Sequence, residues 1–225
     1  MDNDVLRQAP LFSALDDEAA TALRNSMSET SLRRGEVLFS EGDSGDKLYI
    51  VLEGKVKLGR SATDGRENLL AIMGPGQMFG ELSLFDPGPR SATVTAVTDV
   101  SFASLSHEDL LRWLDGRPIV ARGLLTQLAA RLRKSNDVVA DLVFSDVPGR
   151  VAKALLDLAD RFGRTADDGV HVHHDLTQEE LAQLVGASRE TVNKALADFV
   201  HRGWIQLQGK SVVVLDEERL RRRAR

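Results

Sequence analysis

Residues 79–92, FGELSLFDPGPRSA, combine residue types that can hold an anionic ligand. The Glu81 carboxylate can accept hydrogen bonds from sugar hydroxyls, and the Arg90 guanidinium is a planar, two-pronged donor that suits a phosphate. The Ser91 hydroxyl stands beside Arg90 as a further hydrogen-bonding group. A buried salt bridge between Glu81 and Arg90 would use the same residue types, and chemistry alone does not separate the two interpretations.

The backbone of this segment also suits an anion. Gly80 permits close backbone approach because it has no side chain. Residues 81–85 are expected to form a helical turn, and the free N–H groups at a helix N-terminus attract negative charge. If a ligand binds here, we expect its anionic group to meet these N–H groups.

Residues 176–200, LTQEELAQLVGASRETVNKALADFV, carry the local signals of two short helices joined by a sharp turn. Thr177 can cap the first helix, and Glu180 three positions later completes a capping box. Gly186 permits the turn, and Ser188 can cap the second helix. This pattern predicts a helix-turn-helix whose second helix enters the major groove of DNA.

The second of these helices has an apolar and a polar face. The inward residues are expected to be Val192, Ala195, Leu196 and Phe199, and the outward residues Arg189, Glu190, Asn193 and Lys194. Arg189 can bond guanine O6 and N7, and Glu190 can accept from a cytosine amino group. Gln178, Ser188 and the helix N-termini can hold phosphates, which fixes position without reading sequence.

A β-hairpin is expected directly after these helices. Residues 204–207 and 211–215 read as two strands around the turn Gln208-Gly209-Lys210, which would form the wing of a winged helix. Two helices at an elbow can also be a plain packing motif. The exposed Arg–Glu pair and the wing favour DNA binding over that alternative.

The segment from Gly35 to about Leu105 is expected to be the β-structure that positions the first site. Glycines or Gly-Pro turns separate short alternating runs at residues 36–40, 47–53, 56–60, 69–73 and 92–96. This spacing is typical of an antiparallel barrel or sandwich. The acidic run 16–18 is expected to open a preceding helix, with Ala19, Ala22 and Leu23 on one face.

One long helix is expected to begin at Pro118, because Gly123 is the only breaker before Pro148. Steps of four and three residues define a seam over three heptads: Ala121, Leu125, Leu128, Leu132, Ser135, Val139 and Leu142. Such a seam packs either on its own domain or on a second copy, and the length of the helix favours a two-fold pair. The polar break, Ser135 with Asn136 beside it, either sets the register or contacts a ligand.

A breaker cluster at residues 146–149 suits a hinge. A helix, a polar loop at 164–169 and a short strand at 170–173 are expected to follow it. We therefore predict an α+β chain in three parts. These are a β-domain at residues 1–117, a dimerisation helix with hinge at 118–145, and a winged helix-turn-helix DNA-binding domain at 146–225.

Composition excludes whole classes of protein. The 225 residues are 42% hydrophobic and 28% charged and include no cysteine, which excludes disulfides, thiolate nucleophiles and cysteine-ligated zinc or iron–sulfur centres. No apolar run approaches the roughly 18 residues of a membrane helix and no signal peptide is visible, so we expect a cytoplasmic protein. The net charge is −5, yet residues 146–225 hold 13 basic and 13 acidic residues, so a basic face there can still bind DNA.

Both segments resemble parts of one known family. Residues 79–92 resemble the phosphate-binding cassette of cyclic-nucleotide-binding β-rolls, and SRETVNKAL resembles the recognition helix of the cyclic-AMP receptor protein (Crp/Fnr) superfamily. The similarity extends to the actinobacterial cyclic-AMP receptor type through DGRENLL, FDPGPR, FSDVPGRVAK and LTQEELAQLVGASRETVNKALADF. The resemblance covers nearly the whole chain. It implies a homodimeric transcription regulator with cyclic AMP as allosteric ligand and with operator DNA and RNA polymerase as partners.

The resemblance assigns roles in the first site. It implies that Glu81 binds the ribose 2′-hydroxyl and that Arg90 and Ser91 bind the cyclic phosphate. Gly80 and Leu82 would contribute backbone contacts. The cassette would then hold the sugar and phosphate of the nucleotide.

The resemblance also assigns roles on the long helix and in the second site. Ser135 and Asn136 match two polar positions that contact adenine, partly across the dimer. Arg189, Glu190 and Lys194 match the base-reading positions. The DNA site that the family implies is near-palindromic, TGTGA-N6-TCACA.

Other functions fit these residues less well. Haem sensing, which occurs in the same family, is disfavoured because His107 is the only histidine before residue 171. His171, His173 and His174 resemble a metal patch, but no second ligand group is obvious, and an exposed strand is the simpler interpretation. An enzyme such as a cyclic-nucleotide phosphodiesterase needs a metal cluster or an activated nucleophile, and the sequence indicates neither. A kinase regulatory subunit would share the β-roll but lack the winged helix, so the helix-turn-helix pattern disfavours it. The tail at residues 219–225 is expected to be a solvated helix end, with phosphate contact as the alternative.

Overall fold

The computed structural model describes residues 3–12, 15–62, 65, 67–86, 88–115 and 117–224. Asp64, Arg66 and Pro87, which belong to two of the family motifs, lie outside these residues. The chain divides into two compact units, one of residues 1–61 with 70–134 and the other of residues 62–69 with 135–225. Each unit is described by itself.

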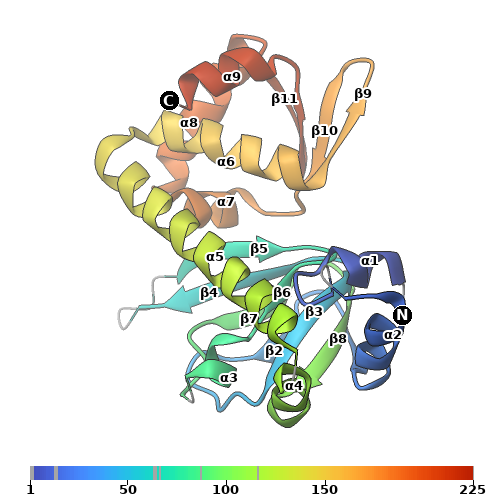
Figure 1. The fold of residues 1–225 in the computed structure, drawn as a ribbon. Helices are drawn as coiled ribbons and strands as arrows, with labels where there is room; N and C mark the ends of the chain where they lie inside the picture. Colours follow the sequence, from blue (N-terminus) through green and yellow to red (C-terminus); the bar gives the residue numbers. More distant parts are fainter. Residues whose placement is uncertain are drawn as a thin grey trace. The chain divides into compact units, whose positions relative to one another are not determined.

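Two four-stranded sheets form the body of the first unit (Figure 1). Their strand orders are β1-β8-β3-β6 and β2-β7-β4-β5. The strands are β1 (Ser28–Leu32), β2 (Val37–Phe39), β3 (Lys47–Glu53), β4 (Val56–Ser61), β5 (Glu67–Met73), β6 (Met78–Phe79), β7 (Thr93–Ala96) and β8 (Val100–Ser106). Alternate residues of β7 are buried, as expected for a strand with one face on a core.

Four aromatic rings stand between the two sheets. Phe39, Tyr49, Phe79 and Phe102 have ring centroids 5.5–6.2 Å apart in the pairs that contact. Phe79 and Phe102 are almost fully buried, so these rings and the valines around them form a hydrophobic cluster. The ring cluster provides an apolar floor for the loops that follow β2 and β6.

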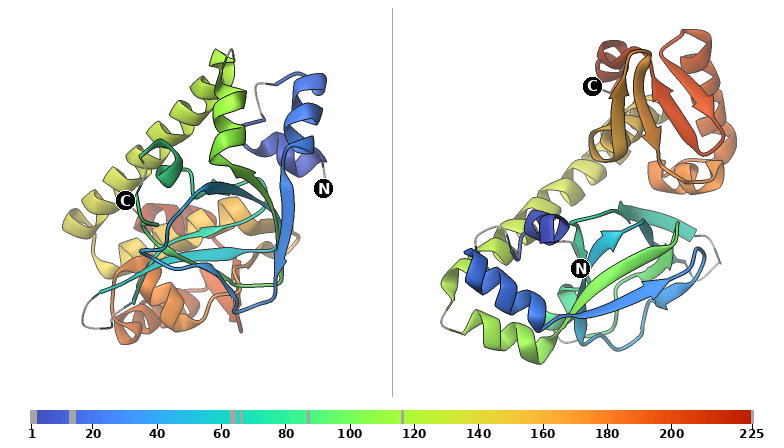
Figure 2. Two further views of the ribbon diagram at one scale, coloured as in Figure 1. Left: turned by 90° about the horizontal axis from the view of Figure 1, so that it is seen from below. Right: turned by 90° about the vertical axis from the view of Figure 1, so that its right-hand side faces the viewer.

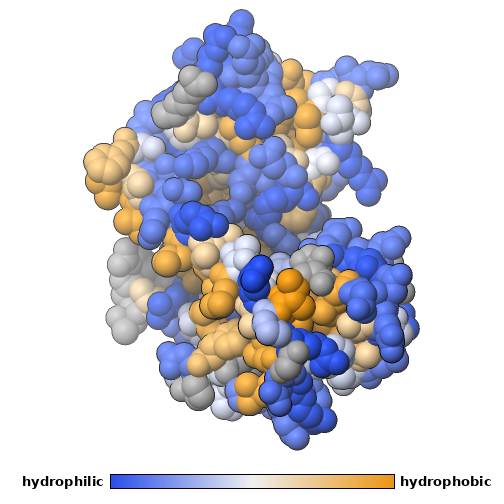
Figure 3. Space-filling model, viewed as in Figure 1, coloured by the Kyte–Doolittle hydropathy of each residue, from blue (hydrophilic) through white to orange (hydrophobic). Residues whose placement is uncertain are grey.

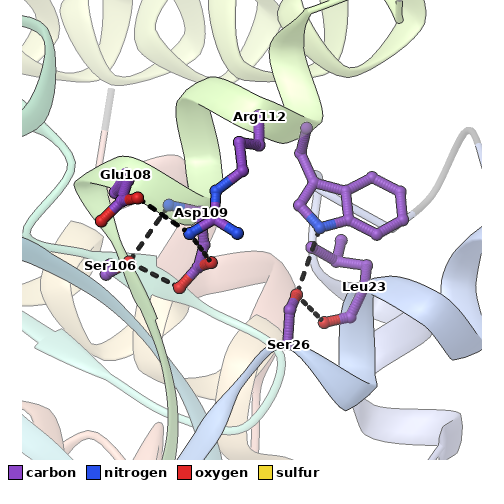
Figure 4. Close-up of polar contacts among 7 residues, drawn as sticks. Leu23, Ser26, Ser106, Glu108, Asp109 and Arg112 are labelled. Carbon is purple, nitrogen blue, oxygen red and sulfur yellow. Dashed lines mark hydrogen bonds and ion pairs between the residues drawn. The ribbon is translucent and has the colours of Figure 1, made fainter.

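Short helices cover the outer side of the first sheet (Figure 2). They are α1 (Asn3–Gln8), α2 (Asp17–Asn25) and α4 (His107–Leu114), and they bury a second cluster that includes Leu6, Leu23, Leu48, Leu105 and Leu110. Ser106 caps α4 by accepting from the Asp109 N–H, and Trp113 Nε1 donates to Ser26 Oγ at 3.1 Å, which ties α4 to α2 (Figure 4).

One long helix, α5 (Pro118–Phe144), leaves the first unit and enters the second. Val120 and Leu124 bury its beginning in the cluster beneath α1, α2 and α4. The seam residues Leu125, Leu132 and Val139 are instead more than 60% exposed, and apolar side chains are visible at the surface along this helix (Figure 3). No helix in the described part of the chain is long and apolar enough to cross a membrane.

The second unit surrounds α6 (Val147–Phe162). A sheet in the order β11-β12-β10-β9 and three further helices complete it. These elements are β9 (Gly163–Ala166), β10 (Gly169–His173), α7 (Gln178–Val185), α8 (Arg189–His201), β11 (Ile205–Gln208), β12 (Ser211–Val214) and α9 (Glu217–Arg223). The α6 side chains Val151, Leu155 and Leu158 are buried at helical spacing, which places one face of α6 on the core of this unit.

The predicted α+β organisation is confirmed, with glycine-punctuated strands, a long helix and a winged helix-turn-helix in that order. The predicted polar loop at 164–169 is wrong in part, because residues 163–166 form β9 and pair with β10. Strands β1, β6 and β8 were not among the predicted runs. These strands and β9 are stabilised by pairing with other segments of the chain rather than by their own periodicity.

Candidate ligand and nucleic-acid sites

Arg90 lies at the centre of the cassette that the sequence predicts. Its backbone is clamped against the loop after β2, because Arg90 N donates to Asp43 O at 2.7 Å and Gly42 N donates to Arg90 O at 2.9 Å. The side chain is 5% exposed and lies over the Phe39 ring, with Cζ 4.2 Å from the ring centroid. A buried guanidinium on an aromatic floor is held rigidly.

The Arg90 guanidinium donates to neutral oxygens. Nη1 donates to Gly80 O at 3.0 Å and to Ser83 Oγ at 3.1 Å, and Nη2 donates to Lys47 O at 2.9 Å. A guanidinium has five N–H groups, and the Nε–H of Arg90 is buried without an acceptor in the described part of the chain. Burial is the main cause that lowers the pKa of Arg90, while the nearby Tyr49, Asp46, Glu81 and Asp43 oppose that shift.

Two glycines make room for this arginine. A Cβ atom at Gly80 would lie 2.9 Å from Arg90 Nη1 and 3.0 Å from Lys47 O, and the φ angle of Gly80 is +83°. A Cβ atom at Gly45 would lie 2.5 Å from Arg90 Nε. The close approach predicted for Gly80 therefore serves the arginine directly, and Gly45 is a second such glycine that the sequence analysis did not single out.

Glu81 is the second buried charge of the cassette, at 1% exposure. Its Oε1 accepts from Arg131 Nη1 of α5 at 2.5 Å, and Arg131 Nη2 also donates to Met78 O. The ion pair of Glu81 is thus made with Arg131, whereas the alternative considered from the sequence was a pair with Arg90. Glu81 Oε2 is buried and has no hydrogen-bond partner among the described residues.

Sequence reasoning missed Arg131. It lies four residues before Ser135 and therefore on the same face of the helix, next to the seam rather than in it. An arginine at that spacing from a predicted ligand contact was a usable signal. It links the cassette to α5 in the first unit.

The two atoms without partners define what this site can bind. Buried polar atoms are seldom left unpaired, so the Arg90 Nε–H calls for an acceptor and Glu81 Oε2 for a donor. A phosphate supplies an acceptor and a ribose hydroxyl supplies a donor. The residues present therefore fit a ligand that carries an anion and a hydroxyl.

The remaining predicted ligand residues are more exposed. Ser91 and Leu82 lie at the surface of the first unit, and Leu82 begins the short helix α3 (Leu82–Phe85). Glu81 occupies the cap position of α3 without a side-chain capping bond. Ser135 and Asn136 are exposed on α5. Their proposed contacts with a nucleotide stay predictions.

The helix-turn-helix has the local bonds that its sequence predicts. Thr177 and Glu180 form a capping box at the start of α7, and Gly186 ends α7 in the left-handed conformation, with φ +69°. Ser188 caps α8 by accepting from the Thr191 N–H at 3.2 Å, and its Oγ also bonds Thr191 Oγ1 at 2.8 Å. The Ser188 hydroxyl is therefore already used inside the helix, so a phosphate contact would have to share it.

The outward face of α8 carries Arg189, Glu190 and Lys194, all exposed. Lys194 Nζ lies 2.7 Å from Glu190 Oε1, a pair four residues apart within the helix. Gln178, the first residue of α7, is also exposed. Asn193 differs from its prediction as an outward residue, because it is half-buried and its Oδ1 atom is buried without a described partner.

The three clustered histidines of the second unit make local contacts. His171 Nε2 lies 2.7 Å from Asp168 Oδ1, His173 Nδ1 bonds Ser211 Oγ, and His174 Nδ1 accepts from the Leu176 N–H. The His171 hydrogen bond is the main cause that lowers the pKa of Asp168. Within the described residues, no group of three or more His, Cys, Asp or Glu side chains is arranged to hold a metal ion.

Family models match both candidate sites. The model of the cyclic nucleotide-binding domain matches residues 29–117, which include the cassette, and the model of the Crp-like helix-turn-helix domain matches residues 149–223, which include α7 and α8. Over 223 residues the chain is 56% identical to the CRP-like cAMP-activated global transcriptional regulator of Mycobacterium tuberculosis, with 99% of this chain and 100% of that protein covered.

Solved structures give the same result. The catabolite activator protein of Thermus thermophilus is 36% identical with a TM-score of 0.56, covering 96% of this chain and 98% of that one. The N-terminal domain of a transcriptional regulator from Streptomyces coelicolor A3(2) is 62% identical with a TM-score of 0.51, covering 64% of this chain and 99% of that one. The similarity thus extends through both units of the chain.

Proposed function

Because the chain belongs to the Crp/Fnr family of transcription regulators, we propose that it binds cyclic AMP and, in response, an operator DNA as a homodimer. The observation that carries the ligand is the pair of buried atoms without partners, Arg90 Nε and Glu81 Oε2, inside the region that matches the cyclic nucleotide-binding domain. The M. tuberculosis relative is named as cAMP-activated, which supports cyclic AMP over other cyclic nucleotides.

In this proposal the nucleotide is held by its phosphate and its ribose. Arg90 and Ser91 bind the cyclic phosphate, Glu81 accepts from the ribose 2′-hydroxyl, and the Gly80 and Leu82 backbone adds contacts. Ser135 and Asn136 on α5 bind adenine, partly from the second protomer. Arg131, which already bonds Glu81, would then sit beside the ribose.

The exposed seam of α5 supports the homodimer. Leu125, Leu132, Val139 and Leu142 are at least half exposed in the single chain. Fully burying an exposed side chain of this size is worth about 1.5–3 kcal/mol, so burying each of them against a second copy is worth about half to two thirds of that. The three parts of the proposal keep the predicted bounds: a nucleotide-binding roll at 1–117, a dimerisation helix at 118–145 and a DNA-binding domain at 146–225.

In the proposed DNA complex, α8 lies in the major groove. Arg189, Glu190 and Lys194 read bases, and Gln178, Ser188 and the helix N-termini hold phosphates. Two such helices in a dimer would meet successive major grooves, about 34 Å apart, on a site of the TGTGA-N6-TCACA type. Contact with RNA polymerase, and activation or repression of a given promoter, would follow from binding at that site.

Cyclic AMP must then raise the affinity for DNA by the same factor by which DNA raises the affinity for cyclic AMP. The test is calorimetric titration of cyclic AMP and of cyclic GMP, with and without a TGTGA-N6-TCACA duplex at stated salt. We expect cyclic AMP to bind about 5- to 150-fold more tightly when the duplex is present. DNA binding that responds to neither nucleotide would overturn the ligand part of the proposal and leave the DNA-binding part.

A further inference from the structure

The first turn of α6 is where three other parts of the second unit converge. Arg150 donates to Ser145 O at 2.7 Å, to Val185 O at 3.1 Å and to Gly186 O at 3.3 Å, which connects the end of α5 with the turn of the helix-turn-helix. Lys153 Nζ lies 2.6 Å from Asp141 Oδ2 of α5. The third contact comes from the C-terminal helix α9.

Asp146 joins α9 to this turn through both of its carboxylate oxygens. Oδ1 accepts from the Gly149 N–H at 2.9 Å and so caps α6, while Oδ2 accepts from Arg223 Nη2 at 2.5 Å. The hydrogen bond from Arg223 is the largest cause that lowers the pKa of Asp146, and the Gly149 N–H and Arg150 act in the same direction. The carboxylate therefore carries its charge at neutral pH.

The packing of α9 against this turn leaves little free space. Leu220 is fully buried, and Gly149 is buried between Asp146 and Arg223. A Cβ atom at Gly149 would lie 3.0 Å from Asp146 Oδ1 and 3.3 Å from Arg223 O. Helix α9 therefore packs against residues 146–149, the cluster that the sequence predicts to be a hinge.

Arg223 is the arginine of α9 that makes this bond. Arg221 bonds Glu217 within α9 and also Asp160, and Arg222 bonds Glu218 within α9. The three arginines carry the same charge on the same short helix. Arg222 therefore provides a matched control in which charge changes but the bond to Asp146 remains.

We propose that Arg223 is a positioning residue for the DNA response: its bond to Asp146 fixes the first turn of α6, and through that turn the ends of α5 and α7. The proposal rests on the proposed function, because it concerns how strongly the ligand changes DNA affinity. Arg223 touches neither ligand nor DNA in this account. It acts by keeping the junction in one arrangement, so that a change in α5 reaches the helix-turn-helix.

The test compares R223Q with R222Q in the full-length protein. Cyclic AMP affinity is measured alone and with the duplex, and DNA affinity is measured with and without cyclic AMP. For R223Q we expect the ligand-induced gain in DNA affinity to fall about three- to tenfold, with cyclic AMP affinity in the absence of DNA unchanged. For R222Q the gain should stay within about twofold of that of the wild type.

D146N gives an independent arm, because asparagine caps a helix about as well as aspartate but lacks the charge that Arg223 bonds. D146N should lower the ligand-induced gain in DNA affinity as much as R223Q does. In the double variant this gain should be no smaller than in either single variant. Faster amide hydrogen exchange at Gly149 in R223Q than in R222Q would show that the turn itself has loosened.

A wild-type gain that R223Q retains in full would overturn this inference and leave the proposed function intact. Additive losses in R223Q and D146N would also overturn it, because the two residues would then act separately. A wild-type protein whose DNA affinity ignores cyclic AMP would overturn the proposed function, and this inference with it.

Discussion

Arg90 has a structural role in addition to the ligand role that we propose for it. Replacing it by leucine would remove the donor to Ser83, which is buried, and to the part-buried Lys47 and Gly80 carbonyls, at up to about 1–3 kcal/mol each, so that loss of binding would be mixed with loss of stability. Lysine keeps the charge and can donate to one of these oxygens, but it lacks the planar guanidinium whose N–H groups point in several fixed directions at once.

We therefore predict that Arg90→Lys lowers cyclic AMP affinity by about tenfold or more while the protein stays folded. Calorimetry measures the affinity, and a thermal melt followed by circular dichroism checks the fold. Arg112→Lys, on the surface of α4 where Arg112 pairs with Glu108 and Asp109, is the matched control and should bind like the wild type. Undiminished affinity in Arg90→Lys would remove Arg90 from the phosphate site.

Asp146 gives a prediction for pH. Its pKa in the folded chain is lowered below the ordinary 3.8, so the bond to Arg223 adds stability that is fully present above the unfolded pKa and is lost as the pH falls through the folded pKa. The Asp146 side chain is 61% exposed, so this contribution is at most about 1 kcal/mol.

The difference in melting temperature between wild type and D146N should therefore be largest near pH 7 and should shrink as the pH falls below the ordinary 3.8 toward the lowered pKa of Asp146. Thermal unfolding of both proteins across that range measures it. In the R223Q background the same comparison should show a weaker dependence on pH, because the largest cause that lowers the pKa of Asp146 is then absent. An equal dependence with and without Arg223 would mean that another group causes it.

At the scale of elements, α7 and α8 are the part of the fold that the sequence predicts most fully. Their caps lie three residues from the atoms they bond, as with Thr177 and Glu180, so the signal is local and readable. Strands β1 and β6 have no such signal, because β1 is stabilised by β8 about seventy residues later. The same holds for Glu81 and Arg131, which are fifty residues apart and are brought together only by the fold.

The predicted DNA contacts of α7 and α8 can be tested by comparing a base-reading residue with a phosphate-binding one. Arg189→Ala should cost about 1–3 kcal/mol on the TGTGA-N6-TCACA site and relax specificity at one base position. Gln178→Ala, at a predicted phosphate contact, should instead weaken all sequences about equally. Binding to a panel of single-base variants of the duplex separates these outcomes. A uniform loss for Arg189→Ala would reassign it to a phosphate.

The tail arginines bear on where DNA can bind. Arg221, Arg222 and Arg223 each bond a carboxylate, so the described part of the predicted basic tail is neutralised within the second unit. This arrangement favours the predicted solvated helix end over a phosphate-binding tail. The exposed residues of α8 that we predict to read bases are thus the principal candidates for DNA contact, in a region whose basic and acidic residues balance.

At the scale of the whole molecule, we propose that the seam of α5 is the dimer interface. A charge in the seam would have to be buried without a partner when two copies pair, so Leu132→Asp should shift the protein from dimer to monomer. Ala130→Asp is the matched control, because Ala130 is exposed on the same helix but lies opposite the seam. Sedimentation velocity measures the assembly state at equal concentrations.

The effects of Leu132→Asp on cyclic AMP binding and on DNA binding test whether the seam contributes to both. If adenine is held partly by the second protomer, Leu132→Asp should also weaken cyclic AMP binding, whereas Ala130→Asp should not. A monomer presents one recognition helix, so the loss on the full palindrome should far exceed the loss on a single half-site, since the second half then contributes nothing. A dimeric Leu132→Asp protein with normal DNA binding would show that the assembly is built on another surface.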